Sequence, residues 1–496
     1  MIIDEKLISR FKNKYNNNSV IINAIANNNL NKISLNNKII QKDHSYFNYN
    51  IKQNDSITNQ ENTGRCWLFA VLNNMRLGMI EKYKLKNFEF SYVYLSFWDK
   101  LEKCNTILNY IEQTKHLNIN SRIVSYLLGD EILSDGGNWH MIKSLINKYG
   151  LIPNDAMKET SNSNNTHMIN NILNIKLKIY TKIIRENKTY SLKNMIAEIY
   201  KLLVYFFGEP PNKINWKYKP TESEKKSMKN NKKTKKNTKK NTNKTQKNVT
   251  TALYKKVNIY SLSKKKKDKL LKCKNLNIED ANMTKEFDKG KSIYNITPLQ
   301  FYNNIVPYDV NRKVVLINDP NKKYYKMYDI KYNKNIINGY SNNYINVPLN
   351  IFKQTVMKSI KNKESVWFSA DVEKDYNSNY GIMNTNIYNK YKILNTKLSV
   401  SKKDNLRYNI SRPNHAMLFT GIYLNKKNKP IKWLVENSWG TENNKGMIYM
   451  FDNWFDKYVY QVIIDKKYLS KTILDIANKK DSIKLDPWDS FGNVAI

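Results

Sequence analysis

Cysteine is scarce in this sequence, with three in 496 residues. So few thiols cannot form a disulfide framework, and an odd number suits reduced thiols in a reducing compartment. Long apolar runs are also missing: Leu202 to Phe207 is among the longest, whereas a membrane span needs roughly 18 to 20 residues. Met1 to Tyr15 lacks the unbroken apolar stretch of a secretory signal. We therefore expect a soluble, cytoplasmic protein that has no membrane partner.

Acidic residues are half as numerous as basic ones, 42 against 84, which gives a net charge of +42. Such an excess suggests a polyanionic partner such as DNA or RNA. However, residues 222–274 hold 20 Lys and only three acidic residues, so this one segment carries about two fifths of the excess. The abundance of Lys and Asn elsewhere indicates a compositional bias. Nucleic-acid binding is therefore an alternative hypothesis.

The chain has enough apolar residues to fold, since 41% are hydrophobic and 12% aromatic. Helical spacing of apolar residues from Cys66 to Tyr83 predicts a buried helix that begins at or near Cys66. The second half predicts strands instead. These are 314–317, 366–369, 417–423, 433–436, 446–451 and 459–464.

We divide the chain into four parts on this basis. Residues 1–220 form an N-terminal part with a helical lobe, and 284–484 contain a β-rich lobe. Residues 221–283 form a Lys- and Asn-rich insertion, which we expect to be disordered because it has almost no apolar residues. Residues 485–496 have the Pro and Gly punctuation of an extended C-terminal arm.

Cys66 follows a glycine turn in the segment Gln60-Glu61-Asn62-Thr63-Gly64-Arg65-Cys66-Trp67. The N-terminus of a helix favours a thiolate through unpaired N–H groups and a partial positive charge. This position predicts a nucleophile. Gln60 could turn its amide toward a developing oxyanion, with the backbone N–H of Cys66 as a second donor.

A thiolate needs a proton acceptor, and His415 opens a predicted strand in Asn414-His415-Ala416-Met417. Asn437, which closes the next strand in Asn437-Ser438-Trp439-Gly440, could accept from the second ring N–H and fix the tautomer. Trp439 could shield that hydrogen bond from water. Gln, Cys, His and Asn in this chain order form the papain-type arrangement.

Several further motifs resemble the bleomycin hydrolase (aminopeptidase C) branch of the papain-like cysteine peptidases. Arg65 stands before the cysteine where secreted papain-like enzymes usually have Ser. The resemblance covers nearly the whole chain except the Lys-rich insertion. It also rests on Phe88-Glu89-Phe90-Ser91, Phe97-Trp98-Asp99-Lys100, Asp135-Gly136-Gly137, Asn318-Asp319-Pro320, Val366-Trp367-Phe368 and Asp486-Pro487-Trp488-Asp489.

The resemblance implies an α+β papain-like fold, with the cleft between a helical and a β-rich lobe, and a cysteine aminopeptidase that needs no cofactor and no metal. Asp135, Gly136 and Gly137 resemble the family's cleft segment, whose backbone groups bind an extended peptide substrate. The C-terminal arm would lie in the cleft, with the carboxylate of Ile496 facing the substrate's α-amine. The family also implies a homohexamer with a basic channel, in which some members bind DNA or RNA.

The sequence departs from the family at Asn138 and His140, where Gln and Asp are usual. Cys66 and His415 are 349 residues apart, roughly 200 more than the ~130 to 150 of ordinary papain-like enzymes, as this branch's long insertions imply. The intact Gln, Cys, His and Asn set argues against a third hypothesis, an inactive scaffold.

Overall fold

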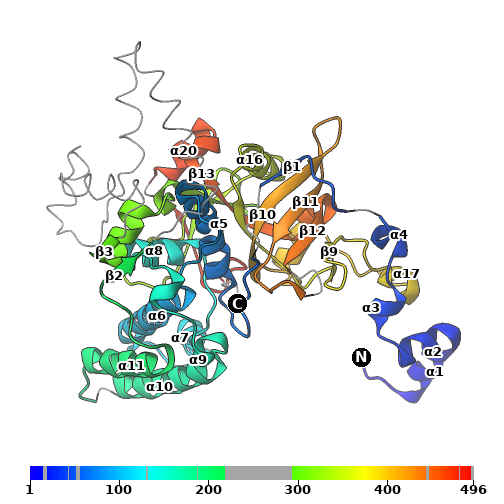
Figure 1. Ribbon diagram of the computed structural model, residues 1–496. Helices are drawn as coiled ribbons and strands as arrows, with labels where there is room; N and C mark the ends of the chain where they lie inside the picture. The colour runs from blue at the N-terminus through cyan, green and yellow to red at the C-terminus, as the bar shows by residue number, and fades with distance from the viewer. Residues whose placement is uncertain are drawn as a thin grey trace, which may run out of the picture.

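The computed structural model describes residues 1–14, 19–42, 44–51, 56–129, 132–186, 188–217, 293–442, 446–479 and 481–492. The whole of the insertion 221–283, including Cys273, and residues 493–496 of the arm, including Ile496, therefore lie outside the described residues. The described chain forms a helical lobe beside a lobe built on a 12-stranded sheet (Figure 1). Helix α5 (Cys66–Tyr83) lies where the two lobes meet and contacts strand β10 (His415–Leu424).

The helical lobe packs around the predicted helix α5. That helix is buried nearly all round, and Lys84 ends it in the left-handed conformation at φ 53°. Side chains cap several of the helices that follow: Ser91 accepts from the N–H of Tyr94, and Asn138 from those of His140 and Met141. These helices are α6 (Tyr92–Thr114), α7 (Arg122–Leu127), α8 (Trp139–Tyr149), α9 (Ser161–Asn164), α10 (His167–Arg185) and α11 (Leu192–Phe207).

The second lobe is a largely antiparallel sheet in the order β14-β5-β6-β4-β13-β7-β10-β11-β12-β9-β8, with β1 added to β10. All six predicted strands are present, as β4, β7, β10, β11, β12 and β13. Helices α16 (Leu349–Lys361) and α19 (Asp452–Tyr458) pack on the sheet. The other strands are β1 (Tyr49–Asn50), β4 (Lys313–Ile317), β5 (Lys326–Ile330), β6 (Tyr344–Asn346), β7 (Val366–Ala370), β8 (Tyr376–Asn377), β9 (Ile382–Met383), β11 (Pro430–Glu436), β12 (Met447–Phe451), β13 (Val459–Asp465) and β14 (Ile483–Leu485).

Each lobe draws on both halves of the chain. Strand β1, from the N-terminal part, pairs with β10, while Phe301 and Tyr302 belong to the core of the helical lobe. The short strands β2 (Ile214–Trp216) and β3 (Ile293–Ile296) pair with each other on either side of the insertion. The insertion therefore leaves and re-enters the fold at neighbouring points.

The N-terminal segment contains more helix than the sequence indicates. We predict one helix at residues 5–15 and polar connections after it, whereas α1 (Glu5–Lys14) is followed by three further helices, α2 (Ser19–Asn27), α3 (Leu30–Ile33) and α4 (Asn37–Ile40). Asn-rich sequence hid them, because Asn favours turns and caps over helix interiors. Asn29, for example, caps α3. Among the described residues, no helix has both the length and the apolar character needed to cross a bilayer.

Candidate active site

Cys66 is the first residue of α5 and its side chain is completely buried. The backbone N–H groups of Ala416 and Trp67 point at its sulfur. Ala416 follows His415 in β10, so the thiol meets the opposite lobe beside this histidine. The structure thus brings the two predicted catalytic side chains to one place from positions 349 residues apart.

The turn before Cys66 is held by hydrogen bonds and an ion pair. Arg65 is 1% exposed and pairs with Glu159 at 3.0 Å. The side chain of Gln60 donates to the C=O of Thr63 at 2.7 Å and accepts from the hydroxyl of Ser438 at 2.7 Å. This pair of contacts orients the Gln60 amide with its NH2 group toward the turn that precedes Cys66.

Asp135 also stabilises the turn that precedes Cys66. Its carboxylate accepts from the N–H of Gly64 at 3.2 Å and from the side chains of Lys100, Thr166 and Asn170. Burial raises the pKa of this carboxyl, but the Lys100 ammonium and the Thr166 and Asn170 side chains outweigh burial and hold the pKa well below its usual range. Asp135 is therefore charged at neutral pH and bound within the protein.

Gly137, two residues after Asp135, lies against Trp67, the residue next to Cys66. A Cβ added to Gly137 would come within 2.4 Å of the Trp67 indole, so no larger side chain fits there. The indole N–H donates to the C=O of Asp135 at 2.8 Å, and Lys103 donates to the C=O of Gly136. The segment 135–137 is thus fixed to both sides of Cys66. Its predicted contact with substrate stays a prediction.

On the opposite lobe, strand register places His415 and Asn437 side by side. Leu418 pairs with Glu436 in the antiparallel ladder of β10 and β11, so the start of one strand lies beside the end of the other. Nε2 of His415 is 2.8 Å from Oδ1 of Asn437. The ring of Trp439 lies 4.7 Å from that of His415, between centroids, and covers this contact.

Burial disfavours both the thiolate form of Cys66 and the protonated form of His415 when each is considered alone. It raises the pKa of the Cys66 thiol to about 12, against the opposing effect of the nearby N–H groups. It lowers the pKa of His415 to about 4, and the bond to Asn437 offsets only part of this shift. Transfer of the thiol proton to His415 forms two opposite charges together, which attract each other, and the α5 N-terminus stabilises the thiolate. The arrangement can therefore generate a nucleophile with its general acid beside it.

Comparison with known proteins gives one consistent result. The model of the peptidase C1-like family matches residues 2–240 and 231–492. Aminopeptidase C of Listeria monocytogenes is 34% identical over 452 residues, which cover 89% of this chain and 87% of the relative. Bleomycin hydrolase of Gallus gallus is 31% identical over 88% of this chain and 86% of the relative. The crystal structure of PepW from Lactobacillus rhamnosis has a TM-score of 0.81 at 29% identity, and the match covers 100% of this chain and 99% of PepW.

The chain belongs to the peptidase C1-like family. This membership confirms the predicted resemblance, the α+β papain-like fold and the cysteine-peptidase class. The comparisons do not support the alternative of a nucleic-acid-binding ring.

Sequence reasoning missed the residues that support the peptidase site. Lys100 and Ser438 were part of quoted motifs, but a motif does not name the partner of each member. Thr166 and Asn170 gave no signal, since polar residues in an Asn-rich chain are common. In the described part of the chain, no three His, Cys, Asp or Glu side chains are grouped as metal ligands would be.

Proposed function

We propose that this protein is a cysteine aminopeptidase that removes N-terminal residues from peptides, with Cys66, His415 and Asn437 as catalytic residues. The observation that carries the proposal is the meeting of the α5 N-terminus with the paired His415 and Asn437 of the other lobe. The relatives named aminopeptidase C support the direction of cleavage.

The reaction proceeds in two steps. The sulfur of Cys66 attacks the peptide carbonyl carbon while its proton passes to His415, and the protonated His415 then gives that proton to the leaving amine. A thioester remains on Cys66. His415 next takes a proton from water, whose oxygen attacks the thioester carbon. The C–S bond breaks, the N-terminal residue leaves as a carboxylic acid, and His415 returns the proton to the Cys66 sulfur. All groups belong to the chain, so we propose that no cofactor takes part.

The oxyanion of each tetrahedral intermediate is bound by the backbone N–H of Cys66 and the side-chain amide of Gln60. Ser438 holds the amide oxygen of Gln60 at 2.7 Å, which keeps the NH2 group in place before the charge develops. Donors set in advance contribute more than donors that must reorganise.

We propose that the C-terminal arm limits cleavage to free N-termini. Backbone groups of Asp135, Gly136 and Gly137 bind the substrate, and the carboxylate of Ile496 pairs with its protonated α-amine. Supporting this, Phe491 is buried at 3% exposure and anchors the arm to the body of the protein. With the upstream subsites filled by the arm, only one or a few residues fit before the scissile bond.

A comparison of free and N-acetylated peptides tests the proposal. The wild type should cleave free peptides much faster, and Cys66→Ala should lose all hydrolysis and thiol labelling with its fold intact. Removal of residues 494–496 should admit N-acetylated and internal cleavage. Full activity of Cys66→Ala would refute the mechanism. Equal cleavage of both peptides, unchanged by truncation, would refute the role of the arm.

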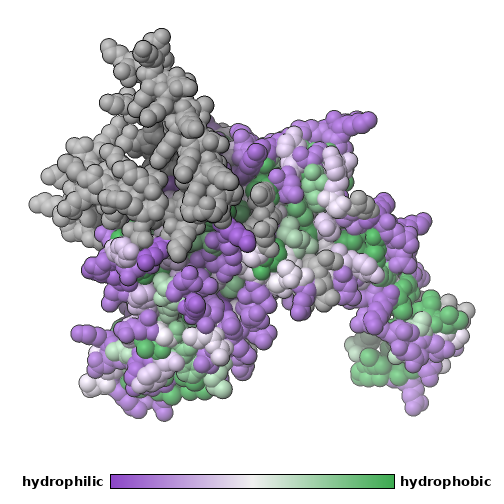
Figure 2. Space-filling view, in the orientation of Figure 1, coloured by the Kyte–Doolittle hydropathy of each residue, from purple (hydrophilic) through white to green (hydrophobic). Residues whose placement is uncertain are grey.

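We also propose a homohexamer in the cytoplasm. Helices α1 and α2 extend away from the body of the protein (Figure 1), and apolar side chains cover part of their surface (Figure 2). The exposed apolar side chains of this region are Ile2 and Ile3, just before α1, Ile8 and Phe11 in α1, and Val20 and Ile22 in α2. Such a surface suits contact between subunits. Light scattering should give six subunits, and Ile22→Glu should lower that number.

The net charge of +42 leaves DNA or RNA binding as a separate hypothesis. It predicts salt-dependent binding that survives Cys66→Ala. If the protein binds neither DNA nor RNA at low salt, this hypothesis is wrong.

A further inference from the structure

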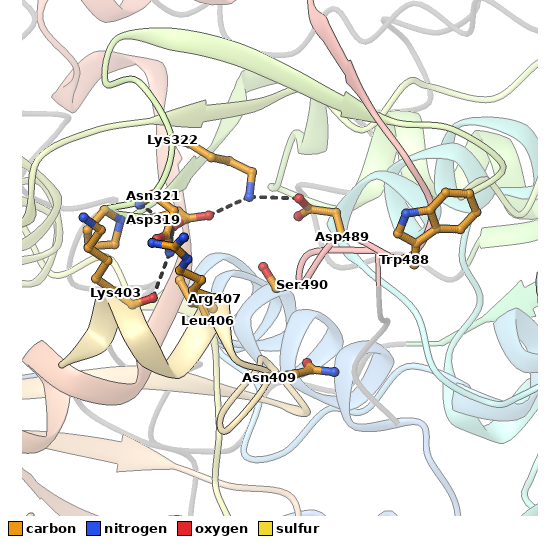
Figure 3. A pocket seen from close by; sticks show the side chains of 11 residues that line it. Asp319, Asn321, Lys322, Lys403, Leu406, Arg407, Asn409, Trp488, Asp489 and Ser490 are labelled. Carbon is orange, nitrogen blue, oxygen red and sulfur yellow. Dashed lines mark hydrogen bonds and ion pairs between the residues drawn. The ribbon is translucent and has the colours of Figure 1, made fainter. Parts of the chain in front are cut away.

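The C-terminal arm is anchored to the protein before its last residues. Lys322 lies between two carboxylates, 2.6 Å from Asp319 and 2.9 Å from Asp489 of the arm (Figure 3). These residues line a cavity of about 610 Å³. The guanidinium of Arg122 lies 3.9 Å from the ring centroid of Trp488. This first anchor fixes the beginning of the arm.

A second anchor lies at the far end of the described arm. The side-chain NH2 of Asn333 donates to the C=O of Gly492. The oxygen of the same Asn333 amide accepts from Asn138 at 2.9 Å and from Asn342 at 3.1 Å. Two donors thus hold that oxygen, and the NH2 group is left to face the arm. Asn333 is 4% exposed, so this orientation is protected from competing water.

Asn138 connects this anchor to the nucleophile. It caps α8 by accepting from the N–H groups of His140 and Met141 at 3.0 and 3.1 Å. It directly follows Gly137, which packs on Trp67 beside Cys66. The arm and the nucleophile are therefore positioned against the same short segment of the cleft wall.

We propose that Asn333 is a specificity-determining positioning residue, which places the arm at a set distance from Cys66 through Asn138. This inference rests on the proposed aminopeptidase function. Four residues follow Gly492, and four extended residues span at most about 14 Å. Fixing the Gly492 carbonyl consequently limits where the terminal carboxylate can stand. Loss of the Asn333 bond should weaken the choice of free N-termini while the chemistry at Cys66 continues.

The test uses Asn333→Asp, which keeps the side-chain shape and the acceptor for Asn138 and Asn342. Only the donor to Gly492 is lost, and a carboxylate oxygen faces the carbonyl in its place. Asn74→Asp is the matched control. Asn74 is also buried, accepts from a side chain (Ser365, 2.8 Å) and donates to a backbone C=O (Ser365, 3.3 Å), but it does not contact the described arm.

The measured quantity is the ratio of kcat/KM for a free peptide to that for its N-acetylated form. Asn333→Asp should lower this ratio at least about tenfold, because a carbonyl loses its donor and meets a repelling charge. Asn74→Asp should leave the ratio unchanged. In the enzyme that lacks residues 494–496, Asn333→Asp should have no further effect. Thiol titration confirms that each variant holds an intact Cys66. If Asn333→Asp does not fold, Asn333→Ala removes the donor to Gly492 without adding charge, and it also removes the acceptor of Asn138 and Asn342.

Two results would overturn the inference in distinguishable ways. If truncation lowers the ratio but both Asn333 variants keep the wild-type value, Asn333 does not position the arm, and the proposed function stands. If the wild type itself cleaves both peptides equally and truncation changes nothing, the proposed role of the arm fails and the inference fails with it.

Discussion

The two lobes position their proposed catalytic side chains by different physical means. In the helical lobe, charged pairs surround the turn before Cys66: Arg65 with Glu159, and Lys100 with Asp135. In the β lobe, strand register and a neutral hydrogen bond place His415, whose pKa is set by burial and Asn437. A turn has few hydrogen bonds of its own and needs outside partners, whereas a strand is held by its ladder. The nucleophile side therefore depends on ionised groups, and the base side does not.

Apart from the loss of Cys66 itself, the largest effect is expected from the β lobe. His415→Ala removes the group that accepts and returns the proton, so kcat/KM should fall roughly 10⁴-fold. Asn437→Ala removes only the group that orients the ring, and the loss should be smaller, roughly 10- to 100-fold. Steady-state kinetics on one aminoacyl substrate measures both. Equal activity in the two variants would show that these residues are misassigned.

The next effect tests the charged support of the helical lobe. Asp135→Asn leaves the Lys100 ammonium, 1% exposed, without its carboxylate, and should lower the free energy of unfolding by about 3 kcal/mol. It also loosens the Gly64 turn, so kcat should fall more than KM changes. Urea unfolding and kinetics measure the two effects.

The matched control for Asp135 lies in the β lobe. Asp465 pairs with Arg312 and Lys313, but Lys313 keeps Glu364 as a second partner. Asp465→Asn should therefore cost about 1 kcal/mol or less and leave kcat unchanged. If both variants behave alike, the contrast between the lobes is wrong.

A smaller effect is expected from a feature that the two lobes share, a buried histidine with a lowered pKa. Burial lowers the pKa of His140 in α8 to about 3 and that of His415 in β10 to about 4. The unfolded chain takes up these protons near pH 6.5 and the folded protein does not, so stability falls as the pH drops from about 6.5 toward 4.

Glutamine variants isolate this effect. His140→Gln and His415→Gln should each flatten the acid side of the stability curve by up to about 1.4 kcal/mol per pH unit. Unfolding free energies measured between pH 4 and 7 would show it. A His140→Gln curve parallel to that of the wild type would mean that this histidine is not buried in its neutral form.

The smallest effect is expected from the Lys- and Asn-rich insertion, which lies between β2 and β3 in the chain. Replacing residues 221–283 with a short Gly/Ser linker should leave kcat/KM and thermal stability nearly unchanged, because a Lys- and Asn-rich stretch has little apolar surface to bury. Trp216 and Ile293, the nearest described strand residues on either side of this segment, pair with each other, so a short linker suffices. An inactive or unfolded product would show that the insertion supports one of the lobes.

The sequence alone determined the secondary structure around Cys66, His415 and Asn437. Apolar spacing located the helix that starts at Cys66, the strand that His415 opens and the strand that ends just before Asn437, because helix and strand periods are short-range properties. It missed α2 to α4, whose Asn-rich sequences resemble turns. The family resemblance then ordered the catalytic set along the chain.

Only the tertiary structure decided which distant polar groups meet. The partners of Asp135 come from three other segments, at Gly64, at Lys100 and at Thr166 with Asn170. Asn333 joins Asn138 to Gly492 from a loop that no pattern marks. A buried polar group must find a partner, but its own sequence neighbourhood does not specify which one. That choice follows from how the lobes pack.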